Sequence, residues 1–159
     1  MVLSILGAAF SYRVLADSYA PGSTPAAPAQ NGYHFAGSAD HVRIDGVVRV
    51  TGDEDQIVVT LTVEAGYHIN ANPASYENLI PTTLTFSGPK VERVIYPKPV
   101  RFKAKFADEA IDVYQGTERI IAIFPKGTLA ADTRLHVILL VQACTDQISL
   151  PPAEIAVGE

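Results

Sequence analysis

Apolar residues in this chain recur at every second position over short stretches that end in turn residues. Residues 42–50 and 57–63 show this period of two most clearly, and the acidic sequence Gly52-Asp53-Glu54-Asp55 lies between them. Side chains that alternate across an extended backbone indicate a half-buried β-strand, because one side packs while the other meets solvent. The two stretches predict an antiparallel hairpin whose loop charges are solvated.

Further short strands are expected downstream, bounded by Gly and Pro. They cover residues 82–86, 91–96, 100–106, 120–124, 133–143 and the region around 155–157. The stretch 133–143 is apolar on both sides, which predicts the longest strand, placed centrally between covering layers. Basic residues on one side of 100–106 predict a solvated edge strand, with a surface for an acidic partner as the alternative.

The region 66–81 is expected to be a structured loop rather than a strand. Its first part, Gly66-Tyr67-His68-Ile69-Asn70-Ala71-Asn72-Pro73, has two Asn residues around Ala, and the second Asn precedes Pro. Asn side chains bond readily to their own backbone in Asx-type turns, and Pro cannot donate to a ladder.

About eight or nine short strands, with no long amphipathic helix after residue 32, predict an all-β fold of the immunoglobulin-like antiparallel β-sandwich type. A barrel is the alternative. A chain of 159 residues can bury a core without disulfide or metal support. The one cysteine excludes an internal disulfide.

The N-terminal region is expected to precede a single folded domain, residues 35–159. Residues 1–16 begin with an apolar segment that lacks a preceding Lys or Arg, so a signal or anchor remnant, a plain helix and cloning-derived sequence remain alternatives. This segment is shorter than the roughly 20 apolar residues needed to span a bilayer. Residues 17–34 are rich in Pro, Ala and Ser, which predicts a flexible linker.

Composition and motifs argue against several classes of function. The net charge of -5 does not favour nucleic acid, which needs clustered Lys and Arg to neutralise phosphates. No Gly-rich phosphate loop is present, and no cofactor is expected. No metal site is expected either, because the histidines are spread singly, at His34, His41, His68 and His136.

The only cysteine, Cys144, is expected at the end of a strand beside a short polar loop, which is followed by Leu150-Pro151-Pro152. A thiol is a candidate nucleophile, although a lone cysteine is also commonly a small buried apolar residue. His136 cannot touch it along one strand, because eight extended residues span about 26 Å. Asp146 would disfavour the thiolate if the two lie close together.

Five segments, taken in order, carry a resemblance to a known family. They are Gly66 to Pro73 as given above, Leu79-Ile80-Pro81-Thr82, Tyr96-Pro97, Val113-Tyr114-Gln115-Gly116, and Gln142-Ala143-Cys144 through Pro151-Pro152. Over residues 35–158 the chain resembles the N-terminal periplasmic domain of the thiol:disulfide interchange protein DsbD. The last segment is the most specific, since that family has a cysteine, four residues, a second cysteine, then an apolar residue and prolines.

The resemblance implies an immunoglobulin-like sandwich in the periplasm, with or without a membrane tether. It implies a cysteine pair that receives electrons from a membrane-embedded thiol–disulfide domain and passes them to thioredoxin-fold periplasmic oxidoreductases, in disulfide interchange and cytochrome c biogenesis. A cap loop over the pair would match the stretch before Val113, with Phe106 as the covering aromatic. The other loop and cap candidates are Asp108, Tyr114 and Asp146.

Ser149 stands where the resemblance places the second cysteine. Dithiol exchange needs an attacking thiolate and a resolving thiol, and a hydroxyl can replace neither. In the family the second cysteine engages the partner, so Cys144 matches the resolving member. An engineered change, a natural loss of redox cycling and a monothiol that uses a cysteine from another chain all remain open.

The chain as written is therefore expected not to cycle as a dithiol. The alternative of another class is a redox-silent immunoglobulin-like module that binds a partner or organises a larger protein. A disulfide-linked dimer through Cys144 is a third hypothesis.

Overall fold

A computed structural model describes residues 36–103, 105 and 109–158 of the chain. These residues form one 3₁₀ turn, η1 (Ser38–His41), and eleven strands. The strands are β1 (Val42–Val50), β2 (Asp55–Val63), β3 (His68–Asn70), β4 (Thr83–Ser87), β5 (Arg93–Ile95), β6 (Val100–Phe102), β7 (Ile111–Tyr114), β8 (Thr117–Phe124), β9 (His136–Val141), β10 (Ala143–Cys144) and β11 (Ala153–Val157).

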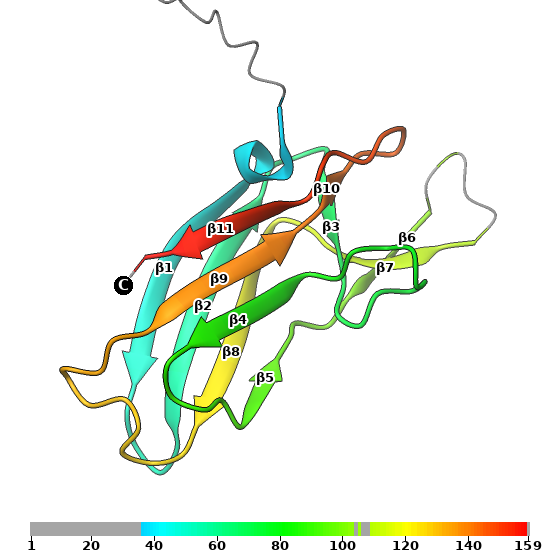
Figure 1. The fold of residues 1–159 in the computed structure, drawn as a ribbon. Helices are drawn as coiled ribbons and strands as arrows, with labels where there is room; N and C mark the ends of the chain where they lie inside the picture. The colour runs from blue at the N-terminus through cyan, green and yellow to red at the C-terminus, as the bar shows by residue number, and fades with distance from the viewer. Residues whose placement is uncertain (1–35, 104, 106–108, 159) are drawn as a thin grey trace, which may run out of the picture. The chain divides into compact units, whose positions relative to one another are not determined.

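The strands pair into three antiparallel sheets, ordered β1-β2-β8-β5, β11-β9-β4 and β10-β3-β7-β6. Figure 1 shows the β11-β9-β4 sheet lying over the β1-β2-β8-β5 sheet, with the third sheet at one end of the pair. Phe86 on β4 meets Phe124 on β8 edge to face, with ring centroids 5.5 Å apart. The predicted all-β antiparallel sandwich is confirmed.

The main core lies between the first two sheets, and β2 alternates between buried and half-buried residues in the predicted way. Ile57, Val59 and Leu61 on β2 are at most 1 % exposed, while the residues between them are half-buried. Hydrophobic burial of this kind, worth about 25 cal/mol for each Å² of apolar surface removed from water, holds the two layers together. The predicted hairpin of residues 42–50 and 57–63 is confirmed as β1 and β2.

Two details of the predicted strands are wrong. The stretch 133–143 is split into β9 and β10, so β1 and β2, with nine residues each, are the longest strands. β9 is the middle strand of its sheet, but Ile138 is 37 % exposed, so solvent rather than a second layer meets its outer face. One-sided burial is normal in antiparallel sheets.

The acidic turn between β1 and β2 is also not wholly solvated. Asp55 is buried, and its carboxylate accepts a hydrogen bond of 2.8 Å from the backbone N–H of Leu129. The edge position expected around 100–106 is confirmed for Val100–Phe102, since β6 is the last strand of its sheet. Lys103 and Lys105 are not part of β6, and residues 104 and 106 lie outside the described residues.

The expected loop at 66–81 contains a strand, β3, which pairs with both β10 and β7. Tertiary pairing has overridden the turn preference of the Asn residues. The predicted segments 1–16 and 17–34 lie outside the described residues. No helix within the described ranges is long and apolar enough to cross a membrane.

Candidate functional site

Cys144 is the last residue of β10 and lies on one arm of a tight hairpin. Backbone hydrogen bonds run from Leu150 N–H to the Ala143 carbonyl, at 2.9 Å, and from Thr145 N–H to the Ile148 carbonyl, at 2.8 Å. The Thr145 hydroxyl closes the turn by accepting two backbone N–H groups, at 3.1 Å each. The thiol is therefore held on ordered backbone, at the strand end that the sequence predicts.

Cys144 and Ser149 face each other across this hairpin as a bridge pair. Their neighbours on either side are hydrogen-bonded to one another, so these two residues occupy a non-hydrogen-bonded position, where Cα atoms are about 4.5 Å apart. The Cys144 thiol donates to the Ser149 hydroxyl with a sulfur–oxygen distance of 3.1 Å. The two positions that the sequence singled out are in direct contact.

The thiol is buried, and only 5 % of Cys144 is exposed. Burial raises the pKa of the thiol above its ordinary value, while the hydrogen bond with Ser149 acts in the lowering direction. A thiol with a raised pKa is mostly protonated at neutral pH and is a weak nucleophile. The resting site therefore holds a protected thiol rather than an exposed thiolate.

Asp146 lies at the hairpin turn, where its carboxylate pairs with the Lys105 ammonium at 2.6 Å. This pair raises the pKa of Lys105, first through the hydrogen bond and then through charge attraction. Asp146 is not among the causes of the shifted Cys144 pKa, which comes from burial. Lys105, which belongs to the basic stretch 100–106, thus has its acidic partner, Asp146, within the same chain.

His68 on β3 is the direct cross-strand neighbour of Cys144. Residues paired in register have side chains on the same face of the sheet, with Cβ atoms about 4.5–5.5 Å apart. His68 is 2 % exposed, and its ring lies against Phe102 of β6, with centroids 4.2 Å apart. Burial lowers the pKa of His68, so the imidazole is neutral at pH 7.

Asn70, two residues along β3, is on the same face and fully buried. Its amide nitrogen donates to the Ile80 carbonyl at 3.0 Å and to the Gln142 side-chain oxygen at 3.4 Å. Its side-chain oxygen has no hydrogen-bond partner in the part of the chain that the structure describes. The face that carries Cys144 is therefore buried but polar.

Tyr114 belongs to the opposite face of the same sheet. It pairs in register with Ile69, which pairs with Ala143, and all three lie in the main core. Its hydroxyl accepts the Asn72 backbone N–H at 2.9 Å and donates to the Asn72 carbonyl at 3.3 Å. Tyr114, a candidate residue for the loop or cap, therefore does not lie on the face that carries Cys144. Phe106 and Asp108 lie outside the described residues.

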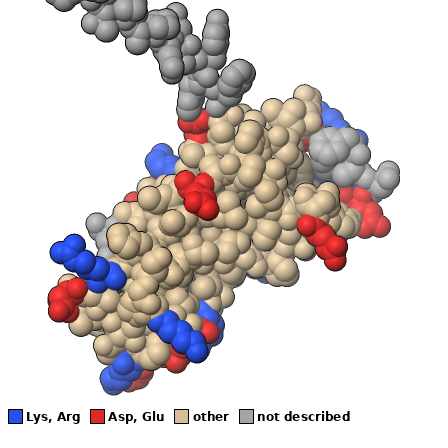
Figure 2. Space-filling view, viewed as in Figure 1, with Lys and Arg blue, Asp and Glu red and all other residues tan. Residues whose placement is uncertain are grey.

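No group of three or more His, Cys, Asp or Glu that could hold a metal occurs among residues 36–103, 105 and 109–158. Figure 2 shows acidic and basic side chains interspersed over the visible face of the described domain. That face carries no continuous patch of one charge.

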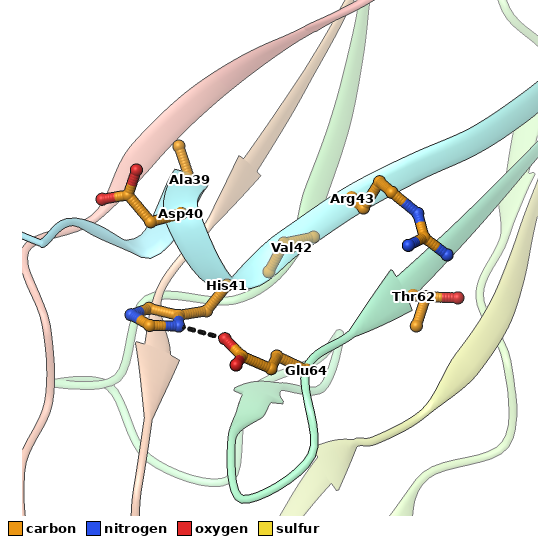
Figure 3. A pocket seen from close by; sticks show the side chains of 7 residues that line it. All are labelled: Ala39, Asp40, His41, Val42, Arg43, Thr62 and Glu64. Carbon is orange, nitrogen blue, oxygen red and sulfur yellow. Dashed lines mark hydrogen bonds and ion pairs between the residues drawn. The ribbon is translucent and has the colours of Figure 1, made fainter.

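A pocket of about 450 Å³ lies elsewhere, where η1 meets β1 and β2. Figure 3 shows the His41 and Glu64 side chains facing one another, and their Nδ1–Oε2 distance is 2.5 Å. The Thr62 hydroxyl, the only one among the described residues that line this pocket, is hydrogen-bonded to Asp45 at 2.5 Å. An imidazole–carboxylate pair without a free nucleophile supports no hydrolytic site here.

The spacing of the histidines along the chain does not predict that His68 lies opposite Cys144, because this pairing joins β3 to β10. The available signal was the His68-Ile69-Asn70 alternation, which places two polar residues on one side of an apolar one.

No family model matches the sequence, and no curated protein matches it. Solved structures do match. The N-terminal periplasmic domain of ScsB from Proteus mirabilis is 15% identical, with a TM-score of 0.52, and the match covers 74% of this chain and 46% of that one. The N-terminal domain of DsbD from Neisseria meningitidis, in the reduced form, is 12% identical, with a TM-score of 0.44, and the match covers 70% of this chain and 82% of that one.

The match spans less than half of the ScsB chain, and at this identity it concerns the fold. The ScsB neighbour is an N-terminal periplasmic domain, which is the kind of domain that the sequence resemblance predicts. The described domain shares its fold with the N-terminal periplasmic domain of ScsB.

Proposed function

We propose that this domain is a periplasmic thiol–disulfide interchange module of the DsbD N-terminal type, with Cys144 as its single reactive thiol. Its partners are thioredoxin-fold oxidoreductases and a membrane-embedded thiol–disulfide domain. Residues 1–16 and 17–34 then serve as an export or anchor segment and a linker to the domain 35–159. The observation that carries the proposal is the contact between the Cys144 thiol and Ser149, at the position where the resemblance has a second cysteine.

The geometry of this pair is suited to a disulfide. A non-hydrogen-bonded pair in an antiparallel hairpin has Cα atoms about 4.5 Å apart, within the range of about 4.4–6.8 Å that disulfides use. The fold similarity to the ScsB domain supports the same function, as does the ordered proline-flanked hairpin that holds the thiol.

The resemblance gives the attacking role to position 149, but with Ser149 there Cys144 is the only thiol that can attack, so only the first half of the exchange is available. The Cys144 thiolate attacks a partner disulfide, a new sulfur–sulfur bond forms, and the partner's other sulfur leaves with the electron pair and takes up a proton. Ser149 cannot resolve this mixed disulfide, so a thiol of the partner must do so. With cysteine at 149, two thiols give two electrons and two protons, and the partner disulfide becomes a dithiol.

The test is electron transfer from the Ser149→Cys domain, fully reduced, to an oxidised periplasmic thioredoxin-fold protein. We expect the partner to gain two thiols while the domain loses two, as read by alkylation and mass spectrometry. The wild-type domain is the matched control, and it should give at most a mixed disulfide that dithiothreitol releases. A partner that stays oxidised beside the reduced dithiol variant would contradict the proposal.

A redox-silent immunoglobulin-like binding module is the second candidate. The burial and the raised pKa of Cys144 favour it, because both make the resting thiol unreactive. Thiol accessibility separates the two. If Cys144 resists alkylation until the domain unfolds, even with a disulfide-bearing partner present, the result favours the binding module over the thiol–disulfide interchange module.

A further inference from the structure

His68 and Cys144 are directly opposite one another on β3 and β10. Adjacent strands place such a pair on one face with Cβ atoms about 4.5–5.5 Å apart, which lets an imidazole nitrogen and a thiol approach each other. Both residues are at least nine-tenths buried, at 2 % and 5 % exposure. The two residues are therefore paired in register at a position shielded from bulk water.

The His68 imidazole makes no hydrogen bond to any residue within the described ranges, and its one ring contact is with Phe102. Buried polar groups are nearly always satisfied, because leaving one unpaired costs about 1–3 kcal/mol. The buried Asn70 side-chain oxygen on the same face also lacks a partner. One buried oxygen without a partner and an imidazole without a hydrogen bond thus lie on the face that carries Cys144, where they leave hydrogen-bonding capacity for a reacting group.

We propose that His68 is the proton acceptor for Cys144 in thiol–disulfide exchange. The inference deepens the proposed function and rests on it. The residue is specified by its place in the sheet, directly across from the thiol, and by its unused ring nitrogens.

Atoms and electrons balance in this step, and the only other reactant is the partner disulfide of the proposed function. The Cys144 S–H bond breaks, its proton moves to a ring nitrogen of His68, and the electron pair remains on sulfur. The thiolate then attacks the disulfide, forming one sulfur–sulfur bond and breaking another. The departing sulfur carries the electron pair and receives a proton from the imidazolium.

The electrostatic state of the pair fits these roles. Burial lowers the pKa of His68, so at neutral pH the ring is in the form that accepts a proton. Burial also raises the pKa of Cys144, so the thiol needs a base to react. The groups that share this face are uncharged on β3, β7 and β6, namely Asn70, Val113 and Phe102. On the hairpin, the charge of Asp146 is paired with that of Lys105.

The test measures how fast the folded domain reacts with the small disulfide 4,4′-dithiodipyridine at a series of pH values. General-base assistance typically contributes about 10²–10⁴-fold, so we expect His68→Gln to lower the rate at pH 7 by about tenfold or more. The variant should also lose the inflection in the pH profile at the pKa of His68. His136→Gln, at an exposed histidine on β9, is the matched control and should leave the profile unchanged.

An unaltered pH profile in His68→Gln would overturn the inference, provided that circular dichroism shows the variant folded. If the His68→Gln variant does not fold, a second measurement on the unmutated domain still tests the inference. The pKa of His68, followed by NMR, should change when Cys144 is converted to a mixed disulfide, and a constant pKa would equally overturn the inference. Neither assay uses a protein partner, so failure of partner reduction by Ser149→Cys counts against the proposed function alone.

Discussion

The two faces of the small sheet β10-β3-β7-β6 are both buried at β3 and β10, but they are built from different residues. One face, with Ile69, Tyr114 and Ala143, is part of the main core. The other face carries His68 and Cys144, which are 2 % and 5 % exposed. Because side chains alternate along a strand, residues 68–70 supply both faces from three consecutive positions.

The faces differ most in how their polar groups are satisfied. On the core face the Tyr114 hydroxyl has hydrogen bonds to both the N–H and the carbonyl of Asn72. On the other face the Asn70 side-chain oxygen has no partner among the described residues, and the His68 ring has no hydrogen bond to them. An unpaired buried polar group destabilises a fold, so under the proposed function one face provides stability and the other chemistry.

The largest expected difference between the faces is in stability. Truncating the fully buried Ile69 to Ala should lower the free energy of unfolding by about 2–5 kcal/mol, since it leaves a cavity in the core. His68→Gln removes no hydrogen bond and should change the free energy of unfolding by less than about 1 kcal/mol. Urea unfolding followed by circular dichroism measures both. Equal losses would show that the two faces are equally structural.

A smaller effect is expected for the satisfied hydroxyl of the core face. Tyr114→Phe leaves the Asn72 N–H without its partner and should lower the free energy of unfolding by about 1–3 kcal/mol. The matched control is Tyr76→Phe, where an exposed hydroxyl bonds to Glu109, and we expect a change below about 1 kcal/mol. Indistinguishable unfolding midpoints for the two variants would contradict the assignment of Tyr114 to the core.

The pH dependence of stability should come from the polar face. The unfolded chain protonates His68 near its ordinary pKa of about 6.5, while the folded pKa is lower. Between these two values the unfolded chain binds more protons, so the free energy of unfolding falls as the pH is lowered through this window.

Cys144 acts at the alkaline end with the opposite sign. Its folded pKa is raised, so above the ordinary thiol pKa the unfolded chain loses its proton first and the free energy of unfolding falls as the pH rises. The contribution of His68 is obtained by measuring the free energy of unfolding against pH for the wild type and for His68→Gln and taking the difference. A difference that does not vary with pH below neutrality would mean that His68 titrates normally in the folded domain.

The smallest effect is expected at the rim of the polar face. The Lys105–Asp146 ion pair is exposed, and such pairs contribute about 0–1 kcal/mol. Asp146→Asn should therefore lower the free energy of unfolding by less than about 1 kcal/mol, and added salt should shrink the difference further. A loss above this range that persists in molar salt would show that the turn is held by more than charge.

The sequence predicts the large elements well and the small sheet poorly, for a physical reason. Residues 42–50 and 57–63 alternate over many positions, so their faces are determined locally. β3 has three residues, and its Asn70 favours turns, so only its pairing with β7 and β10 makes it a strand. The position of Cys144 at a strand end could be predicted, but not its neighbour His68.

The most direct test of the central claim is disulfide formation in the folded Ser149→Cys domain under mild oxidation. We expect one bridged product, lighter by two hydrogens, with no thiol left to alkylate in the native state. Ile148→Cys is the matched control, because the adjacent residue points to the other side of the hairpin and should leave two free thiols. Two free thiols in folded, oxidant-treated Ser149→Cys would contradict the claim that positions 144 and 149 form a redox pair.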